Sequence, residues 1–430
     1  MDSDDGERTT GCHVVAMPYP GRGHVNPMMN LCKLLASRQD DILITFVLTE
    51  EWLDLISSED KPENVRFETI PNVIPSERVR AADFPGFVED VSTKMEAPFE
   101  QLLDRLEPPV TALIADTHVM CAFVVGNRRN IPAASLWPMS ATMFSVFHHF
   151  DLLIQNQHYP VDLSERGEER VGYIPGISST RIYDLPTVFS GDGQRVLNRI
   201  LEMCSWVPKA HYLLFTSVYE LEHEALDALK RKFSFPVYTL GPTIPYFNLG
   251  DESKVATTHS DLNYMKWLDS QSKASVLYVS LGSFLSVSSA QMDEIAAGLR
   301  SSGVRFLWVG RDKASQLQEG CGDGGLVVPW RPNADISYIL GPSPNSKKIV
   351  EDWKIGWRVK REVGWQNLVT REEISGLVKR FMDLESIEVK EMRKRAKDLE
   401  EVCRGAIAKG GSTDTNLDAF LSHISQSRRR

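Results

Sequence analysis

The sequence predicts an α/β protein built on parallel sheets and divided into domains, and three observations lead to this prediction. Short apolar runs rich in β-branched residues alternate with stretches of helical periodicity along the chain. The chain has 430 residues, of which 42% are hydrophobic, and this suffices for two or three domains with substantial cores. Residues 242–260 are rich in Gly, Pro, Ser, Thr and Asp, which indicates a linker between two α/β halves.

The elements of the first half begin with a buried strand at residues 14–17, a tight glycine turn at 21–24 and a helix at 30–38. Further strands of this half are predicted at residues 42–48, 112–115 and 213–217. The second half repeats the pattern, with strands predicted at residues 276–280, 306–309 and 325–328 and a helix at 290–301. Two facing units of this kind favour a nucleotide ligand, whose phosphates are attracted to a helix N-terminus.

A histidine, His24, stands on the glycine turn at the carboxyl end of the first predicted strand. Ligands bind open α/β sheets beyond these strand ends, so His24 can act as a general base toward a substrate hydroxyl. A histidine that only caps a turn explains the local sequence equally well. Asp116 follows the strand predicted at residues 112–115 and, taken locally, can be a strand-end residue that caps the next helix. His118 stands two residues further and could be confused with it in assigning a role.

Charge and composition exclude several classes of partner. The net charge of −10 and the isoelectric point near 5.6 argue against nucleic acid or an anionic membrane as the main partner. No apolar stretch reaches the roughly 20 residues that a membrane helix needs, and the N-terminus is acidic and polar. The six cysteines are widely spaced and contain no Cys-x-x-Cys pair, which favours reduced thiols. We therefore expect a cytoplasmic protein.

A series of short motifs runs along nearly the whole chain. These motifs are residues 18–27 with His24, Trp137-Pro138, residues 173–176, Asp184-Leu185-Pro186, residues 217–222, Leu240-Gly241-Pro242, Trp267-Leu268-Asp269, residues 279–283 and Gly410-Gly411-Ser412. Each is weak alone, but their order and spacing resemble those of the plant family 1 UDP-sugar glycosyltransferases.

The resemblance implies two facing Rossmann-like domains in the GT-B arrangement. An acceptor-binding domain would span residues 1–245, and a linker residues 246–262. A UDP-sugar-binding domain would span residues 263–410, and a C-terminal helix at 411–430 would pack back on the first domain.

The resemblance also implies an activity and its residues. The enzyme would move a hexose, most often glucose, from a UDP-sugar co-substrate to a hydroxyl of a small hydrophobic acceptor, with inversion and without a metal or cofactor. His24 matches the general base, and Asp116 matches the carboxylate that orients it. Ser283 matches a hydroxyl beside the diphosphate, and Trp330 the indole that stacks on uracil. Taken locally, Ser283 can equally be a helix N-cap and Trp330 a core residue.

The chain departs from the family directly after Trp330. Only residues 331–343 separate Trp330 from Pro344, where family-like sequence resumes, so almost all of the donor-binding signature box is missing. Synonymous codons can be chosen for residues 331–343 whose shifted frame encodes Val-Pro-Met-Leu-Thr-Phe-Pro-Ile-Phe-Trp-Asp-Gln, which resembles the end of that box. We therefore expect an incomplete, gapped C-terminal domain and little or no sugar transfer, because the missing groups would stabilise the diphosphate.

Two other functions stay open on the sequence. The chain could be a catalytically inactive product of a mis-spliced or misread transcript that still binds the acceptor. A nicotinamide-dependent oxidoreductase would also use paired Rossmann-like units. The glycine turns do not match G-x-G-x-x-G, which argues against this second alternative.

Overall fold

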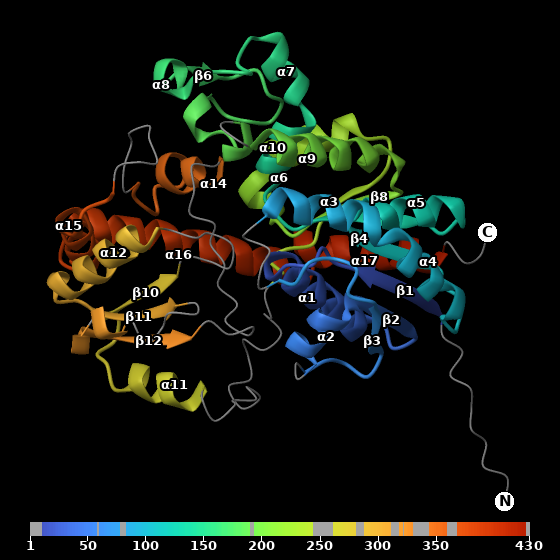
Figure 1. Ribbon diagram of the computed structural model, residues 1–430, viewed down its shortest axis with the longest axis horizontal. Helices are drawn as coiled ribbons and strands as arrows, with labels where there is room; N and C mark the ends of the chain where they lie inside the picture. Colours follow the sequence, from blue (N-terminus) through green and yellow to red (C-terminus); the bar gives the residue numbers. More distant parts are fainter. Residues whose placement is uncertain are drawn as a thin grey trace, which may run out of the picture.

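The computed structural model describes residues 11–57, 60–77, 83–189, 193–243, 261–280, 288–310, 318–320, 322–329, 344–358 and 368–426. The described strands form a seven-stranded sheet, a three-stranded sheet and a two-stranded sheet. Helices surround each of the two larger sheets, and α16 (Ile387–Ile407) runs from one unit toward the other (Figure 1). The predicted α/β class with parallel sheets is confirmed.

The larger sheet lies in the N-terminal half, and every strand pair in it is parallel. Its order is β3-β2-β1-β4-β5-β8-β9. The strands are β1 (Cys12–Met17), β2 (Ile42–Thr49), β3 (Val65–Ile70), β4 (Ala112–Asp116), β5 (Ala133–Trp137), β8 (Tyr212–Phe215) and β9 (Val237–Thr239). The helices around it are α1 (Arg22–Arg38), α2 (Glu50–Ile56), α3 (Phe84–Lys94), α4 (Glu96–Arg105), α5 (Met120–Arg128), α6 (Ala141–His148), α9 (Gln194–Trp206) and α10 (Tyr219–Lys232).

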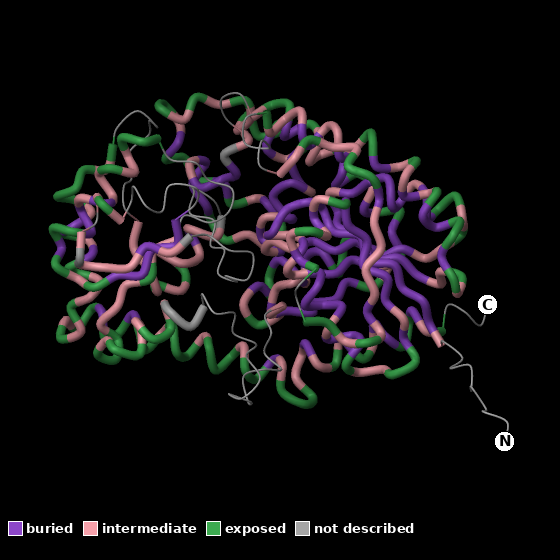
Figure 2. Tube along the Cα trace, turned by 60° about the horizontal axis from the view of Figure 1, so that its bottom comes forward, coloured by how far each residue is buried: buried purple, intermediate pink, exposed green. Residues whose placement is uncertain are grey.

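Strand β1 shows why this sheet is buried on both faces. All six of its residues are buried, and successive side chains point to opposite faces. Val14 and Ala16 belong to one core cluster, and Val15 and Met17 belong to the cluster on the other side. Figure 2 shows buried residues concentrated along the strands of this unit. A continuous apolar run is the pattern that a doubly covered parallel strand requires.

The start of α1 differs from the prediction. The helix begins at Arg22, eight residues before the predicted start at residue 30, and it contains Pro27, which cannot donate a backbone hydrogen bond. The carbonyl oxygen of Gly21 accepts hydrogen bonds from the backbone N–H groups of His24 and Val25, both at 2.9 Å. The helix continues through the proline, and its buried residues on either side include Val25, Met28 and Leu31. His24 therefore lies in the first helical turn, and the predicted tight turn is shorter than expected.

The second half contains a smaller parallel sheet, in the order β10-β11-β12. Its described elements are α11 (Asp261–Asp269), β10 (Val276–Ser280), α12 (Ser289–Ser302), β11 (Arg305–Gly310), β12 (Gly325–Pro329), α14 (Pro344–Lys347), a π-helix (Lys348–Asp352) and α15 (Arg371–Met382). Gly303 follows the last residue of α12 and caps the helix, and its φ of 70° is the left-handed conformation that glycine adopts most readily. The expected gap at 331–343 lies outside the described residues, as does nearly all of the expected linker at 246–262.

The last helix, α17 (Ser412–Gln426), packs on the core of the first sheet. Its buried side chains include Leu417 and Phe420, and Arg38 at the end of α1 forms ion pairs of 2.6 Å with Asp414 and 2.7 Å with Asp418. The turn before it explains the Gly-Gly-Ser motif, because a Cβ on Gly411 would lie 2.3 Å from the carbonyl oxygen of Gly405. The motif is therefore structural.

A segment of the first unit, residues 150–189, contacts the second half of the chain. It includes α7 (Phe150–Gln155), α8 (Leu163–Arg166), the hairpin β6 (Arg170–Val171) and β7 (Thr180–Arg181), and short 3-10 turns at Ile182–Asp184 and Thr187–Phe189. Helix α14 contacts α6 and the first of these turns.

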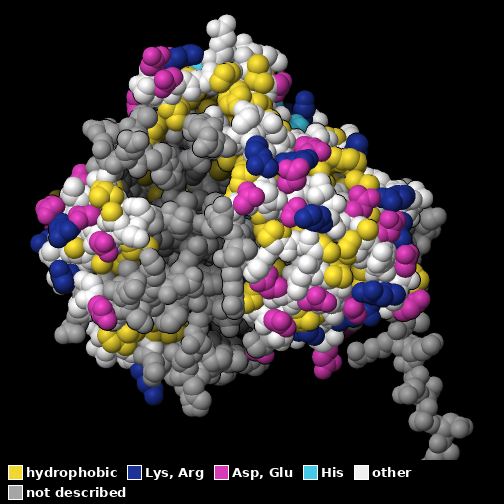
Figure 3. All heavy atoms as spheres, viewed as in Figure 1, with side chains coloured by type: hydrophobic (Ala, Val, Ile, Leu, Met, Phe, Trp, Pro, Cys, Tyr) yellow, Lys and Arg dark blue, Asp and Glu magenta, His cyan; other side chains and the backbone are white. Residues whose placement is uncertain are grey.

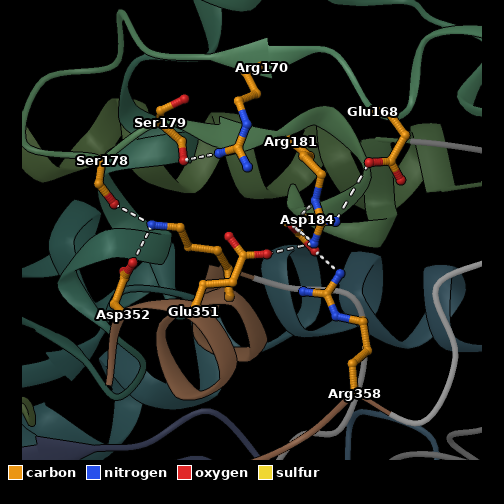
Figure 4. Close-up of polar contacts among 10 residues, drawn as sticks. Glu168, Arg170, Ser178, Ser179, Arg181, Asp184, Glu351, Asp352 and Arg358 are labelled. Atoms are coloured by element: carbon orange, nitrogen blue, oxygen red, sulfur yellow. Dashed lines mark hydrogen bonds and ion pairs between the residues drawn. The ribbon is translucent and has the colours of Figure 1, made fainter. Parts of the chain in front are cut away.

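Ion pairs hold this junction together (Figure 4). Arg181 pairs with Asp184 and with Glu351, both at 2.8 Å, and Arg358 pairs with Asp184 at 2.7 Å. Beside them, the buried Lys347 donates hydrogen bonds to Ser178 and Asp352. Asp184 is fully buried, and the guanidinium groups of Arg181 and Arg358 lie against its two carboxylate oxygens. This assigns a structural role to the Asp-Leu-Pro motif.

The surface shows mixed charge. On the face in Figure 3, acidic and basic side chains intermingle over the described part of the N-terminal unit. Within the described residues, no helix combines the length and the apolar character needed to span a bilayer.

Candidate functional site

The topology of the larger sheet creates the candidate site. Strands β1 and β4 are neighbours at the point where the strand order reverses, and Met17 at the end of β1 pairs with Ala115. Asp116 is the last residue of β4, and His24 follows β1 in the first turn of α1. Both therefore lie at the carboxyl edge of the sheet, at the switch point where open α/β sheets bind ligands.

The structure brings these two residues into direct contact. His24 Nδ1 lies 2.7 Å from Asp116 Oδ2, although the residues are 92 positions apart in sequence. The His24 side chain is 21% exposed, whereas the Asp116 side chain is fully buried. Because a carboxylate only accepts hydrogen bonds, His24 Nδ1 is the donor in this contact.

Asp116 is held in its charged form. Burial alone would raise the pKa of this carboxyl group, but the charge of His24 and the hydrogen bonds from His118 and His24 outweigh burial and hold the pKa well below its ordinary value. The site therefore contains a fixed negative charge behind the His24 ring, which can stabilise an imidazolium if Nε2 takes up a proton.

His118, the competitor that the sequence left open, is also at the site. Its Nδ1 lies 2.8 Å from Asp116 Oδ1, and its backbone N–H donates to the same oxygen at 2.9 Å. The ligand atoms of His24, Asp116 and His118 lie within 4.8 Å of one another, close enough to hold a metal ion. The separations of 2.7 and 2.8 Å are hydrogen-bond lengths, so hydrogen bonding accounts for the arrangement.

Aromatic side chains surround the pair of histidines. The Tyr19 ring lies 5.0 Å from His24 and 6.0 Å from Phe87, and Trp137 stacks on His118 at 5.1 Å. Sequence reasoning identified Trp137 only as part of a motif, without a role. Its position at the end of β5, at the same carboxyl edge as Asp116, was the signal that could have placed it here.

The motif at residues 217–222 has a structural role close to the site. Glu222 is buried, and its carboxylate accepts hydrogen bonds from the backbone N–H groups of Ala141 at 2.9 Å and Thr142 at 3.0 Å. The hydroxyl groups of Thr142 and Ser217 also donate to it. Since the first N–H groups of α6 have no partner within the helix, Glu222 satisfies them and complements the helix dipole.

The two predicted donor-side residues, Ser283 and Trp330, lie outside the described residues. Their neighbours in the chain are described. Strand β10 ends at Ser280 and β12 ends at Pro329, so both predicted residues follow the carboxyl ends of parallel strands in the smaller sheet.

Comparison with known proteins identifies relatives over the full length of the chain. The chain is 48% identical to UDP-glycosyltransferase 87A2 from Arabidopsis thaliana over 457 aligned positions, which cover 99% of each protein. It is 47% identical to UDP-glycosyltransferase 87A1 from the same plant, covering 95% of this chain and 100% of the relative. No protein-family model matches the chain.

Solved structures show the same fold. The chain superposes on Os79 from O. sativa in complex with UDP with a TM-score of 0.79 at 22% identity, covering 96% of this chain and all of that one. The TM-score to Phytolacca americana UGT2, complexed with UDP-2fluoro-glucose and pterostilbene, is 0.77 at 22% identity, with the same coverage. With relatives nearly half identical along its whole length and a matching GT-B fold, the chain belongs to the plant family 1 UDP-glycosyltransferases.

Proposed function

We propose that the gene of this chain encodes an inverting transferase that moves glucose from UDP-glucose to a hydroxyl of a small hydrophobic acceptor. The observation that carries the proposal is the 2.7 Å contact between His24 and Asp116 at the switch point of the larger sheet. We assign His24 as the general base and Asp116 as the residue that orients it. Ser283 and Trp330 are the proposed contacts to the diphosphate and to the uracil ring.

The proposed step begins with a proton transfer. His24 Nε2 takes the proton of the acceptor hydroxyl as the oxygen attacks the anomeric carbon of the sugar. The bond from that carbon to the diphosphate breaks, UDP leaves with the bonding electron pair, and the anomeric configuration is inverted. Asp116 stabilises the imidazolium that forms, because its negative charge lies against Nδ1–H. General-base assistance of this kind contributes roughly 10²- to 10⁴-fold in rate.

The surroundings of His24 support an apolar acceptor. Tyr19, Phe87 and Trp137 are buried aromatic residues in or next to the site, and aromatic faces suit planar hydrophobic ligands. The Phytolacca americana relative was solved with pterostilbene beside a UDP-sugar analogue. We propose that the reaction needs no metal or further cofactor. The widely spaced cysteines favour a cytoplasmic location.

We further propose that this chain is impaired by loss of its donor box. The alignment with UDP-glycosyltransferase 87A2 has 457 positions and the chain has 430 residues, so at least 27 positions, the difference, have no residue here. Strand β10 contains no buried residue, and Tyr278 on it is 38% exposed, although parallel strands are normally covered on both faces. Both observations support an incomplete C-terminal domain, and we place the loss between Trp330 and Pro344.

Transfer assays on two chains test the proposal. A chain with the signature box restored should transfer glucose, and His24→Ala in that chain should abolish transfer while leaving UDP affinity nearly unchanged. Normal transfer by the alanine variant would refute the role of His24. Sequencing the gene and its transcript across residues 331–343 tests the origin of the loss, and an in-frame sequence without a recoverable box nearby would rule out the frame shift.

The second candidate is an inactive product that binds only the acceptor. It predicts that the present chain does not respond to UDP, whereas a chain with the box restored does. A ligand at 100 times its Kd stabilises the folded state by about 2.7 kcal/mol. UDP should therefore raise the Tm of the restored chain and leave that of the present chain unchanged. Equal stabilisation of both, together with glucose transfer by the present chain, would contradict the impairment.

A further inference from the structure

Among the described residues, His118 supplies two of the three hydrogen bonds that the Asp116 side chain accepts. Oδ1 accepts from the His118 backbone N–H at 2.9 Å and from its Nδ1 at 2.8 Å. Oδ2 accepts from His24 Nδ1 at 2.7 Å. The two carboxylate oxygens are thus divided between the two imidazoles, and the plane of the carboxylate is fixed from both sides.

Burial favours the uncharged form of the His118 ring. Burial lowers the pKa of His118 and outweighs the hydrogen bond and charge of Asp116, which act in the opposite direction. Nδ1 must carry a proton because the carboxylate can only accept. A neutral donor holds Asp116 in place without repelling an imidazolium that forms on His24, whose ring centroid is only 5.0 Å away.

Neighbouring rings restrict the orientation of His118. Its ring stacks on Trp137 with an interplanar angle of 21° and meets His24 edge-on at 82°. Trp137 is fully buried and is anchored by a 3.0 Å hydrogen bond from Nε1 to the carbonyl oxygen of Ser140. The side chain of His118 is only 12% exposed. The direction of the Nδ1–H bond toward Asp116 is therefore set by packing.

We propose that His118 is a positioning residue: its ring fixes Oδ1 of Asp116, so that Oδ2 holds His24 in the Nδ1–H tautomer with a bare Nε2. The proposal rests on the proposed role of His24 as the base. Without the ring donor, the backbone N–H of His118 alone remains on Oδ1, and the carboxylate can turn about its last torsion. The bond to His24 then loses its alignment, and hydrogen bonds weaken steeply with misalignment.

Two matched variants of His118 distinguish the effect of its hydrogen-bond donor from the effect of its aromatic ring. His118→Phe keeps an aromatic ring against Trp137 and removes the donor. His118→Asn removes the ring and keeps an N–H donor close to the position of Nδ1. Nitrogen-15 NMR of the full chain without nucleotide distinguishes a protonated from a bare ring nitrogen, with the His24 signals assigned by their loss in His24→Gln. Asp116→Asn serves as the reference for a lost tautomer.

We expect one His24 tautomer, Nδ1–H, in the parent chain and in His118→Asn. In His118→Phe the ratio of Nδ1–H to Nε2–H should fall by about tenfold, because a hydrogen bond to a charged group is lost. An unchanged tautomer in His118→Phe would overturn the proposal, and so would an equal loss in both variants, since the ring and not the donor would then matter. The readout needs no sugar transfer, so failure of the proposed catalytic role would appear separately, in the assay of His24→Ala.

Discussion

The buried carboxylate of Asp184 provides a sharp test of how the two halves of the chain are joined. Its Oδ2 pairs with Arg181 from the same segment, residues 150–189, and its Oδ1 pairs with Arg358 from the second half of the chain. Asp184→Asn keeps the shape of the side chain and removes its charge. The two guanidinium groups, whose side chains are 10% and 12% exposed, then lose a shared counter-ion.

The expected cost follows from burial. Removing one partner of a buried ion pair typically costs about 3–5 kcal/mol, because it leaves an uncompensated charge in a poorly solvated site. Asparagine still accepts a hydrogen bond, and Glu351 still faces Arg181, so we expect about 3 kcal/mol for Asp184→Asn. The exposed pair Arg380–Glu388, at 2.7 Å with side chains 55% and 47% exposed, is the matched control, and Glu388→Gln should leave the urea midpoint nearly unchanged.

Urea unfolding at neutral pH measures these changes, with coincident fluorescence and circular dichroism transitions as the two-state criterion. A double-mutant cycle of Asp184→Asn with Arg358→Met isolates the contact between the halves. We expect a coupling free energy of about 1–3 kcal/mol. Additivity of the two single variants within about 0.5 kcal/mol would refute the reasoning.

Three further predictions concern the site and the first sheet. Asp116→Asn in a chain with the donor box restored should lower kcat by up to roughly 10⁴-fold through loss of the His24 tautomer, with little change in UDP affinity by calorimetry; a normal kcat would contradict the orienting role. Glu222→Ala should cost about 3 kcal/mol in urea unfolding, because the buried N–H groups at the start of α6 lose their partner, and a cost below about 1 kcal/mol would refute the capping role. Burial lowers the pKa of His13 from 6.5 to about 4, so the unfolded chain binds a proton that the folded chain excludes. Stability present above pH 6.5 should therefore be lost as the pH falls toward 4, by about 3 kcal/mol, and His13→Gln should flatten this part of the pH profile.

The sequence motifs differ in whether their residues lie at the candidate site or have a structural role elsewhere. The glycine turn after the first apolar run drew attention to His24, which the structure has in the first turn of α1, whereas Asp116, the last residue of β4, was assigned from the family resemblance. The motif containing Glu222 and the one containing Gly411 proved to be structural, since one caps a helix and the other allows close backbone approach. Local sequence does not distinguish such roles, because a buried glutamate that caps a helix and one that binds a ligand are the same residue type.

The sequence by itself determined the class of the fold and the positions of most strands, because apolar periodicity is a local property of the chain. Only the tertiary structure decided that β1 and β4 are neighbours, that Asp116 divides its oxygens between His24 and His118, and that Asp184 joins the two halves. Those contacts depend on strand order and on packing between residues far apart in sequence, which hydrophobic periodicity does not encode.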